Sequence, residues 1–113
     1  MLQRVLASLT TIEGVEQAML IDDKGHLMAC VGNEGQIPPL EEAKKITTLA
    51  LETCAALGTG QLYEVWCEGD NRMMIDMAGP ERIVVLFGKG GRLARWRHAL
   101  DRDRRMLATT PQM

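Results

Sequence analysis

One segment of this 113-residue chain restricts the fold more than any other feature: residues 83–87, IVVLF, are apolar at every position. Its short length and its β-branched residues are typical of a strand. Successive side chains of a strand point to opposite faces of the sheet, so a strand of this composition needs an apolar environment on both faces. The sequence therefore predicts a strand near the centre of a sheet that is covered on both sides.

A hairpin near the N-terminus has the same property. Residues 14–31 read GVEQAMLIDDKGHLMACV, in which two apolar runs flank the short charged turn DDKG. The glycine of this turn suits the positive φ that tight hairpin turns require. An ordinary antiparallel hairpin has one polar face, but this one is apolar on both. The sequence favours strands over 15–22 and 26–31, with 15–22 beside 83–87 at the centre of the sheet.

Helical periodicity marks three segments, and short turns separate the remaining strands. Pro38-Pro39 suits the start of a helix, because the first helical position needs no N–H donor, and Gly58 suits its end. The expected helices are 2–12, 40–57 and one that begins near Leu93; the further strands are 62–68, 72–77 and 82–87.

This order, α-β-β-α-β-β-β-α, predicts a single α+β domain over residues 1–108, followed by a flexible C-terminal tail, 109–113. Five antiparallel strands form its sheet, and the helices lie on both faces. Helix 40–57 covers one face alone, and the first and last helices share the other. The chain is long enough to bury a core, but a core of this size is marginal.

The helix over 40–57 is apolar around more than one stripe, which a helix with one buried face does not need. Five strands make a sheet roughly 20 Å wide, whereas one helix is about 10 Å across, so part of this face stays bare. We therefore predict a symmetric homodimer in which this helix meets its copy and the edge strand 62–68 pairs with its own copy. The expected interface residues are Ala43, Ile46, Leu49, Ala50, Thr53, Cys54, Tyr63 and Val65.

Composition excludes several classes of function. The formal net charge of -2 argues against a dedicated nucleic-acid binder. No apolar run approaches the ~18 residues of a membrane span, so we expect a cytoplasmic protein. The three cysteines, Cys30, Cys54 and Cys67, are widely spaced and form no CxxC pair, which favours reduced core thiols over a metal site. The sequence indicates no catalytic acid-base pair or triad, and no cofactor or metal is expected.

Two motifs invite a functional interpretation. The run GKGG, residues 88–91, precedes a helix, but it lacks the spacing of a phosphate-binding P-loop, so a flexible turn is favoured. The last helix carries six arginines and two aspartates, six minus two, a local charge of +4. An acidic partner, a nucleic acid or a GTPase transition state could use these charges, but a solvated helix face is favoured. The arginines are Arg92, Arg95, Arg97, Arg102, Arg104 and Arg105.

The chain resembles the roadblock/dynein light chain domain family over nearly its whole length. The resemblance rests on IEGV at 12–15, DDKG at 22–25, the alanine-rich helix that ends in Leu57-Gly58, and LYEV at 62–65. It implies a profilin-like fold, homodimerisation through the second helix and third strand, no obligatory cofactor, and regulation of small GTPases or motor NTPases. Bacterial members look like partners of Ras-like GTPases in polarity, motility or signalling.

The leading hypothesis is a non-enzymatic homodimeric adaptor that binds a small Ras-like GTPase and modulates its GTP hydrolysis or nucleotide state, as an activator or a scaffold. Two alternatives stay open: a small-molecule sensor of GAF or longin type, and a passive scaffold subunit. Dimer symmetry brings together both copies of the polar fringe of helix 40–57. The expected partner-binding residues are Glu41, Glu42, Lys45, Thr48 and Glu52.

Overall fold

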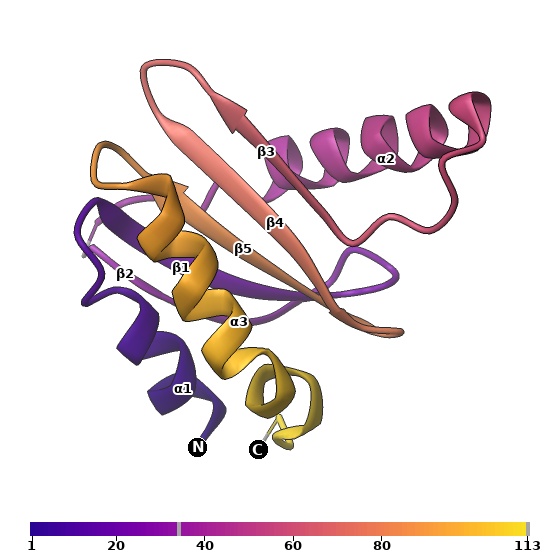
Figure 1. Ribbon diagram of the computed structural model, residues 1–113. Helices are drawn as coiled ribbons and strands as arrows, with labels where there is room; N and C mark the ends of the chain where they lie inside the picture. Colours follow the sequence, from indigo (N-terminus) through magenta and orange to yellow (C-terminus); the bar gives the residue numbers. More distant parts are fainter. Residues whose placement is uncertain (34, 113) are drawn as a thin grey trace.

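The computed structural model describes residues 1–33 and 35–112 and has the predicted order of elements, α-β-β-α-β-β-β-α (Figure 1). The elements are α1 (Leu2–Leu9), β1 (Val15–Asp22), β2 (Leu27–Gly32), α2 (Leu40–Leu57), β3 (Glu64–Glu68), β4 (Arg72–Gly79), β5 (Arg82–Gly88) and α3 (Leu93–Thr109).

The five strands form one antiparallel sheet in the order β2-β1-β5-β4-β3. β5 is the central strand and pairs with β1, so that Met19 lies opposite Val85. The predicted central pairing is therefore confirmed. β3 lies at one edge of the sheet, also as predicted, and β2 lies at the other.

Helices cover both faces of the sheet: α1 and α3 lie side by side on one face, and α2 crosses the other (Figure 1). The side chains of β5 alternate between the two layers. Val84 and Leu86 belong to the core beneath α1 and α3, which is centred on Trp96 and Leu100. Val85 belongs to a smaller core beneath α2. Both cores need apolar side chains from β5, which explains its uninterrupted apolar sequence.

The first helix is shorter than predicted and ends at Leu9 instead of residue 12. The Thr10 and Thr11 hydroxyls each donate a 2.7 Å hydrogen bond to the carbonyl three residues earlier, a pattern that competes with helix continuation. Five limits, on four of the strands, also differ by one or two residues from those predicted. β2 begins at Leu27 and includes Gly32, β3 begins at Glu64, β4 extends to Gly79 and β5 extends to Gly88.

The predicted domain limit at residue 108 falls inside the last helix, because Thr109 is still helical. Thr110 is buried, and the Arg82 guanidinium donates hydrogen bonds to the carbonyl oxygens of Leu107 and Thr110. These bonds satisfy carbonyls that a helix C-terminus leaves without an intrahelical partner. The packed part of the chain therefore extends at least to residue 110.

No helix within residues 1–33 and 35–112 combines the length and the apolar composition that a membrane crossing requires.

Candidate functional site

Helix α2 covers its face of the sheet only in part. Its C-terminal turns extend away from the sheet (Figure 1), and Ala43 and Thr47 are its buried residues. Three of its leucines are solvent-exposed: Leu49 by 56%, Leu51 by 46% and Leu57 by 70%. Leu49 and Leu51 point to different sides of the helix, and large exposed apolar side chains of this kind indicate surface that another molecule can cover. The extra apolar stripe seen in the sequence is therefore not used within the chain.

An apolar groove of about 420 Å³ separates α2 from the edge strand β3. The predicted dimer seam lies here, because Leu49, Thr53 and Val65 all line the groove. Trp66 also contributes to the lining, although its side chain points to the opposite face of β3 from that of Val65. The lining residues are Ile46, Leu49, Ala50, Thr53, Cys54, Leu62, Glu64, Val65, Trp66 and Cys67.

Two predicted seam residues do not line this groove. Ala43 is fully buried in the core beneath α2, where it supports the helix and is not available to another molecule. Tyr63 lies just before β3, and its side chain is 68% exposed, while its carbonyl oxygen accepts a hydrogen bond from the Met77 amide. The prediction that all three cysteines are core thiols is wrong for Cys67, which is exposed at the groove, and for Cys54, which is half-buried and lines the same groove.

The outer edge of β3 is open. β3 pairs with β4 on one side, with Val65 opposite Ile75, and it has no neighbouring strand on its other side within the described residues. An open edge presents unpaired N–H and C=O groups to any strand that approaches it. The groove and this edge adjoin, so one partner could cover both.

The predicted partner-binding residues lie together on the solvent side of α2. Glu41, Glu42, Lys45, Thr48 and Glu52 line one shallow hollow, together with Lys44 and Leu49. The Lys44 ammonium lies 3.5 Å from a carboxylate oxygen of Glu41, which is an exposed pair of little energetic consequence. This surface is mixed in charge, and through Leu49 it is continuous with the groove.

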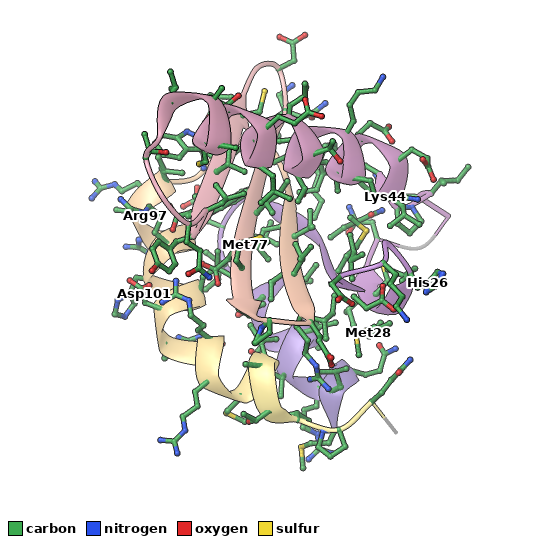
Figure 2. All side chains as sticks on the ribbon, turned by 90° about the vertical axis from the view of Figure 1, so that its right-hand side faces the viewer. His26, Met28, Lys44, Met77, Arg97 and Asp101 are labelled. Atoms are coloured by element: carbon green, nitrogen blue, oxygen red, sulfur yellow. The ribbon has the colours of Figure 1, made fainter. Side chains whose placement is uncertain are left out.

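A smaller hollow of about 210 Å³ lies between α2 and the β1–β2 turn. Lys44 of α2, labelled in Figure 2 near His26, lies over Gly25 of this turn. The Asp22 carboxylate accepts hydrogen bonds from the amides of His26 at 2.8 Å and Lys24 at 2.9 Å; the first of these is the main reason that the pKa of Asp22 is lowered. Asp22 therefore stabilises the turn. Pockets that bind small molecules are larger, about 300–1,000 Å³.

The GKGG loop at 88–91 is a packing junction. The Lys89 amide donates to the Gly14 carbonyl at 2.9 Å, and a Cβ on Gly14 would lie only 2.2 Å from the Gly90 oxygen. The Arg72 guanidinium donates to the carbonyls of Gly90 and Gly91 and stacks 4.7 Å from the Trp96 ring. A phosphate site presents N–H groups, whereas this loop turns carbonyls toward a cation. The turn interpretation fits the loop better than a nucleotide site.

The arginines of α3 do not form one solvated face, which corrects the interpretation favoured from the sequence. Arg104 makes a bidentate ion pair of 2.8 and 2.9 Å with Asp76, which is 1% exposed, and the hydrogen bond with Asp76 raises the pKa of Arg104. Arg97 pairs with Glu64 at 2.9 Å, on the flank of α3 near β3 (Figure 2). Both pairs fasten α3 to the sheet. The sequence offered one signal for the first, a lone aspartate within the apolar strand MMIDM.

Among residues 1–33 and 35–112, no group of three histidine, cysteine or carboxylate side chains is placed to hold a metal ion. The site consists of an apolar groove, an open strand edge and a polar helix surface. Such a combination serves protein binding.

No protein-family model and no curated protein matches the chain. Among solved structures, MglB of Thermus thermophilus, described as a gliding protein, is similar with a TM-score of 0.79 at 23% identity, over 95% of this chain and 85% of that one. A structure described as MglB with a tetrameric arrangement gives the same values. A roadblock/LC7 domain from Streptomyces avermitilis has a TM-score of 0.74 at 16% identity, over 93% of this chain and 96% of that one.

These similarities span almost all of the chain and include the order of helices and strands, the five-stranded antiparallel sheet and the helices on it. The fold of this protein is the roadblock fold.

Proposed function

We propose that this protein is a homodimeric, non-enzymatic adaptor that binds a small Ras-like GTPase and modulates its GTP hydrolysis or nucleotide state. The observation that carries the proposal is the uncovered apolar groove between α2 and β3, which adjoins the polar surface of α2. The resemblance to roadblock proteins points in the same direction.

The second copy is the natural occupant of the groove. A two-fold axis beside β3 brings α2 against its copy, so that each groove receives the exposed leucine of the other chain. The same axis allows β3 to pair with its copy, which removes two open edges at once. A protein of the same fold, MglB, is described in a tetrameric arrangement, which supports assembly of several copies.

The GTPase then binds across the paired α2 helices. Their solvent sides carry Glu41, Glu42, Lys45, Thr48 and Glu52 from each copy, and the dimer doubles this surface. A partner that spans both copies buries more area than one chain can offer, and two sites held together act with a high effective concentration. Cytoplasmic location is part of this proposal.

A charge reversal on α2 tests the partner surface. The double variant Glu41→Lys, Glu52→Lys is expected to weaken binding of the cognate Ras-like GTPase by at least about tenfold, because it inverts one charge at each end of the contact. Calorimetry with purified GTPases from the same genome measures binding, and single-turnover GTP hydrolysis measures the effect on the nucleotide.

The control is Glu81→Lys, since Glu81 is exposed in the turn between β4 and β5, away from α2. Equal affinity for the wild type and the α2 variant contradicts the partner surface. If every Ras-like GTPase of the organism fails to bind and keeps its hydrolysis rate, the proposed function is wrong. Binding with unchanged hydrolysis and exchange identifies the passive scaffold.

A sensor module of GAF or longin type is the second candidate from the sequence. The hollow between α2 and the β1–β2 turn is its nearest counterpart in the structure, but its volume of about 210 Å³ is below that of ordinary ligand pockets. This hollow is therefore too small to support a sensor function by itself.

A further inference from the structure

A second groove lies on the opposite face of the sheet from α2, between α3 and the segment that follows α1. It has a volume of about 370 Å³. Its walls come from one stripe of α3, because residues three or four apart share a face of a helix. The lining residues are Ile12, Arg92, Ala94, Arg95, His98, Ala99 and Arg102.

Arg97 and Arg104 form ion pairs with carboxylates of the sheet. The cationic side chains of this groove form no such pair with the sheet among the described residues. No carboxylate of the described residues lies within ion-pair distance of Arg92 or Arg95. Arg102 bonds its neighbour Asp103 with two contacts of 3.0 Å, and its side chain is still 50% exposed. The ion pairs thus separate five of the six arginines into two that hold α3 on the sheet and three that line a groove, and the exposed Arg105 belongs to neither set.

This concentration of positive charge is local. The chain as a whole has a formal net charge of -2, so a general excess of basic residues does not explain three guanidinium groups and an imidazole around one hollow. Guanidinium groups hold carboxylates in bidentate geometry, and such charge-assisted bonds are among the stronger polar contacts.

We propose that this groove binds an acidic segment of a partner protein in extended conformation. The stretch from Arg92 to Arg102 spans about 15 Å along the helix axis, which matches four or five residues of extended chain. The partly buried Ile12 and the buried Ala99 give the groove an apolar floor between the arginines. A segment in which carboxylates alternate with apolar side chains fits both features.

Other polyanions fit less well. A nucleic-acid surface needs a wide basic face, usually with exposed aromatic rings on which bases stack, but Trp96 of this helix is buried. A membrane-binding helix places large apolar side chains beside its basic ones, whereas the exposed residue between the arginines here is Ala94. An acidic peptide is the partner whose size and chemistry the groove matches.

This proposal does not depend on the GTPase. Helices α2 and α3 lie on opposite faces of the sheet (Figure 1). The polar surface of α2 and the groove beside α3 can therefore be occupied together. In a dimer formed through α2 and β3, each copy keeps its own groove free. The adaptor then links whatever binds α2 to a protein with an acidic segment.

Fluorescence anisotropy with a labelled peptide tests the proposal. The probe is the octapeptide ELELELEE, in which carboxylates and apolar side chains alternate, and QLQLQLQQ is its neutral counterpart. At about 150 mM NaCl the acidic peptide is expected to bind the wild-type protein at least about tenfold more tightly than the neutral one. The double variant Arg92→Glu, Arg95→Glu is expected to abolish this difference. Both side chains are exposed, and a glutamate at the start of a helix suits the helix dipole.

The control double variant Arg4→Glu, Arg105→Glu changes the net charge equally but alters no residue of the groove. It is expected to retain peptide binding, and Arg95→Glu alone is expected to lose part of it. Absence of binding up to about 1 mM peptide overturns the proposal, as does an equal loss in both double variants. Tighter binding of single-stranded DNA or of phosphatidylserine vesicles through Arg92 and Arg95 also overturns it.

Discussion

A Leu49→Glu variant is expected to be monomeric at concentrations at which the wild-type protein is dimeric, while its chain stays folded. Leu49 is 56% exposed and lines the groove between α2 and β3, so its replacement costs the single chain little. In the proposed dimer, the glutamate would be buried against apolar side chains without a partner. Such burial costs about 3 kcal/mol or more, which weakens the dimer by at least about 100-fold.

Light scattering over a concentration series measures this change, and circular dichroism verifies the fold. The matched control is Leu51→Glu: Leu51 is 46% exposed on the same helix but lines the hollow at the β1–β2 turn instead. This control is expected to remain a dimer. Three outcomes would contradict a dimer formed through α2 and β3. They are a monomeric wild-type protein, a dimeric Leu49→Glu variant, and equal dissociation of the Leu49→Glu and Leu51→Glu variants.

The choice of Leu49 depends on the structure. In the sequence, Ile46 and Leu49 are equivalent members of the expected interface, but Ile46 also packs against the core beneath α2. A glutamate at that position is expected to destabilise the chain itself, so aggregation would not distinguish a lost dimer from a lost fold.

The second large effect concerns the ion pair between α3 and the sheet. Arg104→Ala is expected to lower the free energy of unfolding by about 3 kcal/mol, because it leaves the Asp76 carboxylate buried without its cation. Asp76 lies in β4 and is 1% exposed, and the Arg104 guanidinium contacts both of its carboxylate oxygens. Urea unfolding followed by tryptophan fluorescence, at one protein concentration, measures the change.

Arg105→Ala is the control, since Arg105 is the next residue of the same helix and is exposed. Its effect is expected to stay within about 0.5 kcal/mol. Adding Asp76→Asn to Arg104→Ala is expected to recover part of the lost stability, because the unpaired charge is then gone. Equal stability of the two single variants would show that the bidentate pair does not hold α3 on the sheet.

The polar contacts that the sequence did not predict join residues that are far apart in the chain. Nothing near Asp76 in sequence identifies Arg104, 28 residues later, as its partner. Likewise, the GKGG run can be interpreted as a flexible turn or an anion site until Arg72 is found against its carbonyls. The six arginines of α3 are alike in sequence, and only the rotation of the helix on the sheet separates Arg97 and Arg104 from the arginines of the second groove.

The sequence alone determined the order of the elements, the central position of 83–87 beside 15–22, the edge position of the third strand and the incomplete cover that α2 gives. These properties follow from hydrophobic periodicity and from the widths of helices and sheets, which are local or generic quantities. The tertiary structure decided which polar groups meet, that Ala43 is core and Leu49 surface, and where the basic groove lies. Those outcomes depend on strand register and on the orientation of each helix, which are fixed only when the whole core packs.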